Sequence, residues 1–301
     1  MEAEVTVPMK TNYCRLAIIF ARQATKAVIF RRGPTDWVQI ILWHTDTDTF
    51  EEGQWFRGRI YHKRADLSPD GSKLIYLAAK HHRWRTIDPE YSTAWTAISK
   101  PPYLTALALW RNIDTHGGGG YFEDNNTVWI NLPYLGDLRA MAHRNHLPPA
   151  DLNIKSREGY VKSENSLSEL SLQRNGWMMI QEKEQHYYNV SHIYEPPGIW
   201  EKTNGDYTIS MKIVGFDLNK RHRNRELHEF RLLDKVSSSE IGIETDTLAN
   251  WDQQNRLVYV KAGQLLAGEI HNGKIEARVI ADFNANKPKL ITSPEWAKKW
   301  D

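Results

Sequence analysis

Cysteine is nearly absent from this 301-residue sequence: Cys14 is the single one, so no disulfide can form within the chain. Long apolar runs are missing as well. The longest, residues 16–21, has the length of a strand, far short of the roughly 20 residues that a membrane-spanning helix needs. The first residues also lack the basic region and apolar core of a secretory signal. We therefore expect a cytoplasmic protein in a reducing compartment that does not contact a membrane.

An excess of charge of one sign is also missing. The sequence has 39 Lys and Arg against 37 Asp and Glu, a formal net charge of +2. A nearly neutral chain has no overall field that draws it to nucleic acid or to anionic lipid. A partner of either kind would have to be bound by a local basic patch.

The short motifs that mark common enzymes and metal sites do not occur either. There is no Gly-x-Ser-x-Gly elbow and no phosphate loop ending in Gly-Lys-Ser/Thr. The sequence from His228 has Leu232 where the second histidine of a His-Glu-x-x-His zinc motif belongs. A calcium loop starting at Asp282 would need a glycine where Lys287 stands. We expect no metal and no cofactor.

The most informative stretch that is present is a turn followed by an apolar strand, in residues 66–79. Pro69 fixes φ near about −65° and Gly71 accepts positive φ, so Ser-Pro-Asp-Gly at 68–71 predicts a tight turn between two strands. A weaker copy occupies residues 250–260, where Leu-Val-Tyr at 257–259 matches Leu-Ile-Tyr at 74–76. The two copies indicate a repeated sheet unit.

Short β-branched and aromatic runs separated by turn residues continue along most of the chain and predict about fifteen strands. The run 103–110 is expected as a strand or edge turn, with a helix as the alternative. Residues 133–146 have a proline start, a stripe of Leu135, Leu138 and Ala142, and basic residues near the end. They therefore predict a helix, followed by a long loop to residue 174.

A chain of many short strands with little helix is compatible with three architectures: a pair of sandwiches, a barrel or a propeller. The copied turns begin at Asp66 and Asn250, which are 184 residues apart, or about four repeats of the roughly 40–45 residues of a propeller blade. The phrase Ser-Pro-Asp-Gly-x-x-Leu-x-Tyr resembles the inter-strand turn of WD-repeat and Tol-system-type propeller blades.

The expected fold is therefore all-β: a single β-propeller-like domain of about 5–6 antiparallel blades over residues 13–301. It would follow a tail at 1–12 and contain a helical or loop insertion near 133–174. We also expect residues 14–21 to pair with residues 275–283, because this pairing would close the ring and remove a sheet edge.

A four-glycine run, residues 117–120, is the most unusual candidate site, and it follows Asp114 and His116. Glycine lets a backbone approach a ligand, and His116 could act as an acid or base beside Asp114, as in a hydrolase. The alternative is a tight loop or bulge in which side chains would clash with a neighbouring strand. The structural alternative is favoured.

Two basic runs supply the candidate binding residues. These are Lys220, Arg221, Arg223 and Arg225 in one run and Arg83 and Arg85 in the other. As a functional patch they would dock an acidic protein partner or neutralise phosphates. Because Glu226 and Glu229 offset the first run, a protein partner is favoured over nucleic acid; a solvated surface without function is the other alternative.

A propeller exposes a broad face of loops, which suits the binding of another protein, and the sequence has no catalytic motif. The expected function is a non-enzymatic cytoplasmic protein-interaction scaffold or accessory subunit. Residues 95–110 and the glycine run are also similar to bacterial proteins of unassigned function. Bacterial propeller-like proteins of this kind can serve in signalling or defence, for example beside a CRISPR-guided protease. The alternatives are a hydrolase with a site at the propeller mouth near His116, and a nucleic-acid-binding accessory that uses the basic loops.

Overall fold

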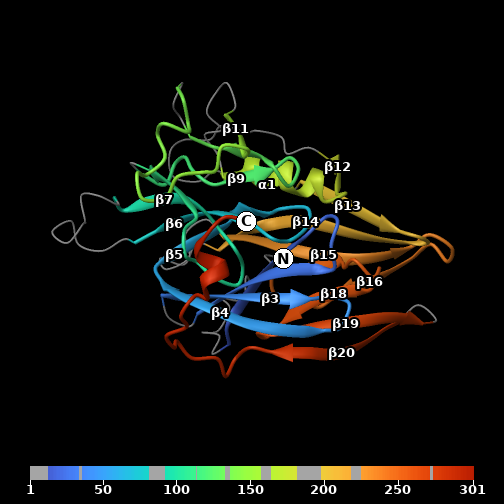
Figure 1. Cartoon of the computed structure of the whole chain (residues 1–301). Coiled ribbons are helices and arrows are strands. Elements are labelled where there is room, and N and C mark those ends of the chain that lie inside the picture. The colour runs from blue at the N-terminus through green and yellow to red at the C-terminus, as the bar shows by residue number, and fades with distance from the viewer. Residues whose placement is uncertain are drawn as a thin grey trace.

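The computed structural model describes residues 13–33, 36–80, 92–112, 114–132, 136–156, 164–181, 198–217, 225–271 and 274–301. Within these ranges the chain is almost entirely β-structure with one α-helix, and its strands form five sheets (Figure 1). In each sheet strands that follow one another in the sequence are neighbours, and all but one of these pairs within the described residues are antiparallel. The prediction of an all-β, propeller-like fold is confirmed. The predicted tail at 1–12 lies outside the described residues.

The first two sheets have four strands each, and every neighbouring pair is antiparallel. Their strands are β1 (Arg15–Phe20), β2 (Lys26–Arg32), β3 (Trp37–His44) and β4 (Thr49–Arg57), then β5 (Arg59–Leu67), β6 (Leu74–Ala79), β7 (Ala94–Ser99) and β8 (Ala108–Asn112). The middle strands β2, β3 and β6 are apolar and buried along nearly their whole length. Such continuous burial is typical of strands that are covered on both faces.

The remaining three sheets differ in size. The third has β9 (Gly120–Phe122), β10 (Thr127–Ile130) and β11 (Asn153–Ser156), and the last pair is parallel. The fourth has β12 (Met178–Gln181), β13 (Ile199–Asn204), β14 (Tyr207–Asp217), β15 (Arg225–Asp234) and β16 (Ser239–Ile243). The fifth has β17 (Ala249–Trp251), β18 (Leu257–Lys261), β19 (Gln264–His271) and β20 (Lys274–Asp282).

The two copied turns occupy equivalent places in two different sheets, as the repeat predicted. One joins β5 to β6 and the other joins β17 to β18, so each connects the first and second strands of a four-stranded sheet. Side chains hold both turns. The Ser68 hydroxyl accepts the Lys73 N–H at 2.9 Å, and Asp252 Oδ1 accepts the N–H groups of Gln254 and Arg256 at 2.9 and 2.8 Å.

The predicted pairing of residues 14–21 with residues 275–283 is wrong. Within the described residues β1 pairs with β2 and β20 pairs with β19. The physical reason is that each end of the chain completes a four-stranded sheet of its own, so no strand is left to be shared. The first and last sheets nevertheless lie side by side (Figure 1).

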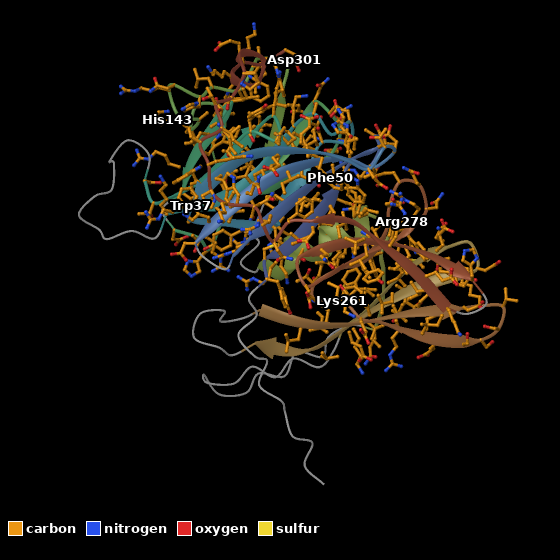
Figure 2. The ribbon with its side chains drawn as sticks, turned by 90° about the horizontal axis from the view of Figure 1, so that it is seen from below. Trp37, Phe50, His143, Lys261, Arg278 and Asp301 are labelled. Atoms are coloured by element: carbon orange, nitrogen blue, oxygen red, sulfur yellow. The ribbon has the colours of Figure 1, made fainter. Side chains whose placement is uncertain are left out.

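Side chains join these two sheets in place of a shared strand. Apolar residues of the first sheet, including Cys14 and Trp43, form one buried cluster with Val258, Leu265 and Phe283 of the fifth sheet and its following loop. The rings of Phe50 and Phe283 meet edge to face at 5.5 Å between centroids. Figure 2 shows Phe50 and Arg278 where the two sheets meet.

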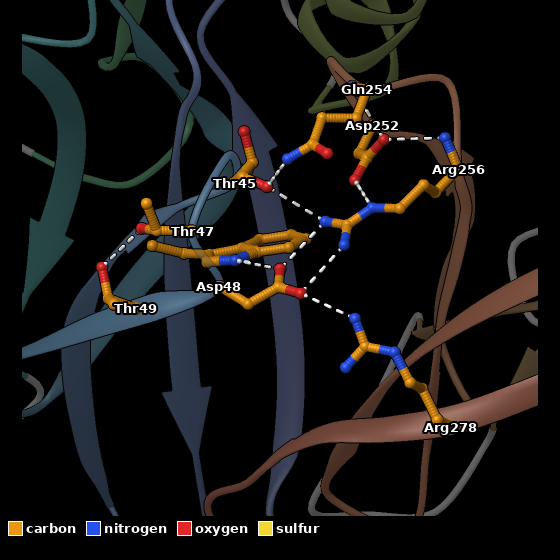
Figure 3. Close-up of polar contacts among 9 residues, drawn as sticks. Thr45, Thr47, Asp48, Thr49, Asp252, Gln254, Arg256 and Arg278 are labelled. Carbon is orange, nitrogen blue, oxygen red and sulfur yellow. Dashed lines mark hydrogen bonds and ion pairs between the residues drawn. The ribbon is translucent and has the colours of Figure 1, made fainter.

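A polar network covers one edge of this apolar contact (Figure 3). Arg256, after the turn that follows β17, donates to both carboxylate oxygens of Asp48 at 2.8 and 2.9 Å. Its Nε donates to Asp252 at 2.8 Å, and its Nη2 donates to the Thr45 carbonyl at 3.0 Å. Arg278 reaches Asp48 from β20 at 3.1 Å. One guanidinium therefore connects the β3–β4 turn to the last sheet.

The helix predicted at 133–146 is also wrong where the structure describes it, from residue 136 onward. Residues 136–146 form turns, because the segment is held by the edge of the second sheet: Ala142 makes an isolated bridge to Trp110, whose ring N–H donates to the Leu138 carbonyl at 2.7 Å. The helix of the described residues is α1, Glu164–Arg174, in the stretch that was expected to be a loop.

Candidate functional site

Every sheet contributes to one region of the molecule, near the ends of strands β1, β5, β9, β13 and β17. Strands β1 and β9 both lie against β5, and β13 lies against β17. A cavity of about 230 Å³ opens here. We call it the cationic pocket, and its lining includes Phe20, Arg22, Arg174, Lys202, Trp251 and Gln253.

Arg22 connects three sheets at the base of this region. Its Nη1 contacts the Asp66 carboxylate of β5 at 3.3 and 3.4 Å, and its Nη2 donates to the Phe122 carbonyl of β9 at 2.6 Å. The Asp66 side chain is 4% exposed, and burial raises the pKa of its carboxyl while Arg22 opposes the rise. The positive charge of Arg22 is therefore matched by a buried carboxylate.

Arg174 is the last residue of α1 and has no ion-pair partner in the described structure. Its Nη2 donates to the same Phe122 carbonyl that Arg22 uses, and its guanidinium lies over the Tyr121 ring, 4.6 Å from the centroid. Burial, and then the charge of Arg22, lower the pKa of Arg174. Among the described residues its Nε is buried without a hydrogen-bond partner. The charge of Asp66, which Arg22 already contacts, only partly opposes the lowering of this pKa.

Lys202, on β13, is the second cation of the pocket that has no carboxylate partner among the described residues. Its ammonium donates to the Asn250 side-chain oxygen at 2.9 Å, and its carbonyl accepts the Trp251 ring N–H at 3.0 Å. Burial lowers the pKa of Lys202 to about 8. Around neutral pH the side chain is still mainly charged, so a partly desolvated ammonium faces the cavity with only a neutral partner.

Asp252 is the acidic residue of the pocket lining, and its carboxylate already has a partner within the protein. The Asp252 carboxylate is fully covered and bonds to Arg256, as described above. Beside it, Gln253 Nε2 donates to the carbonyls of Ala21 and Lys26 at 3.1 and 2.7 Å, which fixes the amide orientation. Gln253 Oε1 is buried and receives no hydrogen bond from any residue that the structure describes. The pocket therefore has a net positive charge, an unused donor and an unused acceptor.

The arrangement suits an organic anion. Arginine and lysine side chains form their strongest hydrogen bonds with carboxylate or phosphate oxygens, and the gain is larger where water is partly excluded. Phe20 and Trp251 add aromatic walls to the same cavity. Among the described residues no group of three or more His, Cys, Asp or Glu could hold a metal ion.

The structure brings the sequence-predicted pair Asp114 and His116 together. His116 Nδ1 lies 3.1 Å from Asp114 Oδ2, and the His116 backbone N–H, bonded to Asp114 Oδ1 at 2.8 Å, lowers the pKa of the Asp114 carboxyl. The two side chains are 78% and 58% exposed. Within the described structure no hydroxyl or thiol forms a hydrogen bond with His116.

The glycine run packs closely against neighbouring strands. Gly118 and Gly119 have φ of +93° and +75°, and a Cβ on Gly119 would lie 2.1 Å from the Arg64 carbonyl oxygen. The buried Arg64 side chain donates from Nη1 to the carbonyls of residues 115, 116 and 117 at 2.8 to 3.0 Å. These close contacts explain why glycines occur here, since a side chain would clash with the neighbouring strands.

The predicted basic patch cannot be placed. Lys220, Arg221 and Arg223 lie outside the described residues, between β14 and β15, and so do Arg83 and Arg85, between β6 and β7. Arg225 begins β15, opposite Asp217 of β14. The acidic protein partner of this patch stays a prediction.

Another hollow, of about 430 Å³, lies between residues 136–139 and 150–156. Its arginine, Arg139, is used within the chain, because it donates to the carbonyls of Pro149 and Leu152, the first at 2.6 Å. The described part of this hollow offers no cation that lacks internal partners. None of the described helices has the length and apolar character needed to cross a bilayer.

Sequence reasoning missed the three cations of the cationic pocket, because they are single residues spread over 180 positions. One signal was available for Lys202. It lies two positions after Trp200, and alternate residues of a strand share a face, so a buried Trp200 places Lys202 on the inward side. Arg174 gave no such signal, since a basic residue in the last turn of a helix is common for electrostatic reasons alone.

The fold and the pocket together define a propeller-like β protein with a cationic cavity where its sheets converge. No family model matches the sequence, and no curated protein matches it. Among solved structures, the chain is similar to the β-propeller domain of the Trilobed protease from Pyrococcus furiosus, described as having an open velcro topology. The identity is 11%, the match covers 88% of this chain and 83% of that chain, and the TM-score is 0.29.

The chain is also similar to a structure from a study of two prolyl endopeptidases, at 11% identity and a TM-score of 0.22. That match covers 95% of this chain and 44% of the other, so this chain spans less than half of that protein. Both similar structures come from peptidases. The prediction of a non-enzymatic scaffold or accessory subunit is corrected on this finding. Similarity at this level concerns the fold and says nothing of the activity of this chain.

Proposed function

We propose that this protein binds an organic anion in the cationic pocket. One observation carries the proposal: Arg174 and Lys202 line the same cavity, and neither forms an ion pair with another described residue. Partly buried charges without counter-ions cost free energy, and the lowered pKa values of both side chains express this cost. An anion between them would offset it.

The pocket itself distinguishes an organic ligand from a small inorganic ion. Phe20 and Trp251 supply aromatic surface beside the cations, and a hydrated inorganic ion gains nothing from such surface. The ligand is therefore expected to carry an anionic group next to an apolar one. This proposal rests on the pocket, not on the peptidase structures to which the fold is similar.

The test is calorimetric titration of the full chain with benzoate, which joins a carboxylate to an aromatic ring, at constant ionic strength. Arg174→Gln and Lys202→Gln should each weaken binding by about tenfold to 150-fold, since a hydrogen bond to a charged group contributes about 1.5–3 kcal/mol. Lys212→Gln is the matched control, because Lys212 is an exposed lysine on the neighbouring strand β14. Equal affinity in all four proteins, or no binding by the wild type, contradicts the proposal.

A hydrolase that uses His116 and Asp114 is the second candidate function. The contact of 3.1 Å between His116 Nδ1 and Asp114 Oδ2 favours it, because a carboxylate can orient a histidine that acts as a base. The assay is hydrolysis of a fluorogenic peptide by the wild type and by His116→Ala. Hydrolysis that the substitution abolishes without unfolding the protein would establish this function, and no hydrolysis by the wild type would exclude it for that substrate.

A further inference from the structure

We infer that the ligand of the cationic pocket is the C-terminal residue of a polypeptide, with a free carboxylate and an apolar side chain. This inference rests on the anion binding proposed above and names its substrate class. Three features of the pocket support it: the size of the cavity, the balance of charge, and the buried hydrogen-bonding groups that lack partners among the described residues.

The cavity is too small for a large ligand. Pockets that enclose drug-sized molecules have volumes of about 300–1,000 Å³. The cationic pocket has about 230 Å³, enough for one end group while the rest of the ligand stays outside. The end of a polypeptide chain has this shape, because its last residue can enter alone.

The balance of charge favours a carboxylate. Asp66 contacts Arg22 directly, whereas Arg174 and Lys202 form no direct ion pair with a described residue. A monoanion in the cavity can accept hydrogen bonds from cations of its lining, and Asn250 continues to hold the Lys202 ammonium. A carboxylate has two oxygens for two such donors.

The leftover groups distinguish a peptide from other anions. Within the described part of the chain, Gln253 Oε1 is a buried acceptor without a donor, and the Nε of Arg174 is a buried donor without an acceptor. A C-terminal residue offers both kinds of partner within a few atoms, since its amide N–H lies beside its carboxylate. A phosphate monoester or a fatty acid has no N–H donor. Phe20 and Trp251 then face the side chain of the last residue.

The test compares three ligands by calorimetry on the full chain: an acetylated tripeptide ending in leucine with a free carboxylate, the same peptide with a C-terminal amide, and inorganic phosphate. We expect the free acid to bind at least about tenfold more tightly than the amide, because the amide cannot form the two charged hydrogen bonds. Arg174→Gln and Lys202→Gln should remove this preference, and Lys212→Gln should keep it. Circular dichroism of each variant establishes that it is folded.

The outcomes separate the inference from the proposed function. If benzoate or phosphate binds in an Arg174-dependent way but the acid and the amide peptide bind equally or not at all, the peptide assignment is overturned and anion binding stands. If no anion binds the wild type, both are overturned. A free acid that binds in preference to the amide, through Arg174 and Lys202, supports both.

Discussion

Arg256→Ala should separate the first and last sheets at their polar contact and destabilise the whole protein. The guanidinium forms hydrogen bonds with Asp48, Asp252 and the Thr45 carbonyl, and so joins the β3–β4 turn to the turn after β17. No strand is shared between the two sheets. Removal of this side chain therefore leaves the apolar contact and hydrogen bonds that do not involve Arg256, such as those from Arg31 to Phe283 and from Gln253 to Ala21.

The expected loss follows from the burial of the partners. The Asp252 side chain is fully covered, whereas those of Asp48 and Arg256 are 17% and 21% exposed. Removing one partner of a buried ion pair costs about 3–5 kcal/mol. Because the N–H groups of Gln254 and Arg256 still bond to Asp252, we expect the lower end, about 3 kcal/mol. The melting midpoint should then fall by about 6–12 °C.

Arg278→Ala is the control for this prediction. Arg278 bonds to the same Asp48, but its side chain is 67% exposed, so its loss should cost less than about 1 kcal/mol. The assay is urea denaturation of the wild type and of both variants, followed by circular dichroism. An Arg256→Ala variant that loses no more stability than Arg278→Ala would refute the reasoning that the partly buried Arg256 guanidinium contributes strongly to the contact between the two sheets.

The pH dependence of the same contact has a definite sign. Burial alone would raise the pKa of Asp48, but its hydrogen bonds with Arg256, and the charge of Arg256, outweigh burial and lower it. A carboxyl whose pKa is lowered by folding stabilises the protein above its unfolded pKa. This stability is lost as the pH falls through the folded pKa. The acid sensitivity from Asp48 should therefore be smaller in Arg256→Ala than in the wild type.

Three further predictions test other parts of the structure. Gly118→Ala should destabilise the protein by about 1–3 kcal/mol, since φ is +93° and a Cβ would lie 2.4 Å from a side-chain nitrogen. Gly136 has open space around it, so Gly136→Ala should change the stability little in the same urea assay. Lys202 has a folded pKa of about 8, which is below its unfolded value. Between about pH 8 and 10.5 the unfolded chain therefore binds more protons at Lys202 than the folded chain does. Over that range the stability of the wild type relative to Lys202→Gln should rise with pH in denaturation curves. Cys14 is 1% exposed and burial raises the pKa of its thiol, so Ellman's reagent should react with it only after unfolding, and rapid reaction in the native protein would contradict this packing.

The sequence alone predicted the sheets, because their strands are specified locally. The Ser-Pro-Asp-Gly turn and its copy carry the backbone requirements of a tight turn, and both lie at equivalent places in their sheets. The buried positions of Cys14, Trp43 and Trp110 also follow from apolar strand patterns. Each of these features depends on a few neighbouring residues.

The errors concern contacts between distant segments. A strand shared between the two ends of the chain was expected to close the ring. Instead, side chains such as Arg256 join the first and last sheets, across more than 200 positions of the sequence. The pattern at residues 136–146 fits a helix locally. Its Leu138 and Ala142 instead pack against Trp110 of β8, and tertiary packing overrides helix propensity. The cationic pocket could not be predicted for the same reason, because the end of α1 and the first, fourth and fifth sheets bring its lining together.

The pKa of Lys202, followed by NMR of its side-chain ¹⁵N or ¹³Cε resonance, tests the central claim most directly. Without ligand the pKa should be about 8, because the ammonium is buried beside a neutral amide. Saturation with the leucine-ended peptide should raise it, since a carboxylate within hydrogen-bonding distance favours the charged form. A pKa that is unchanged by saturating ligand would show that the anion does not bind beside Lys202, and would contradict the function proposed for this pocket.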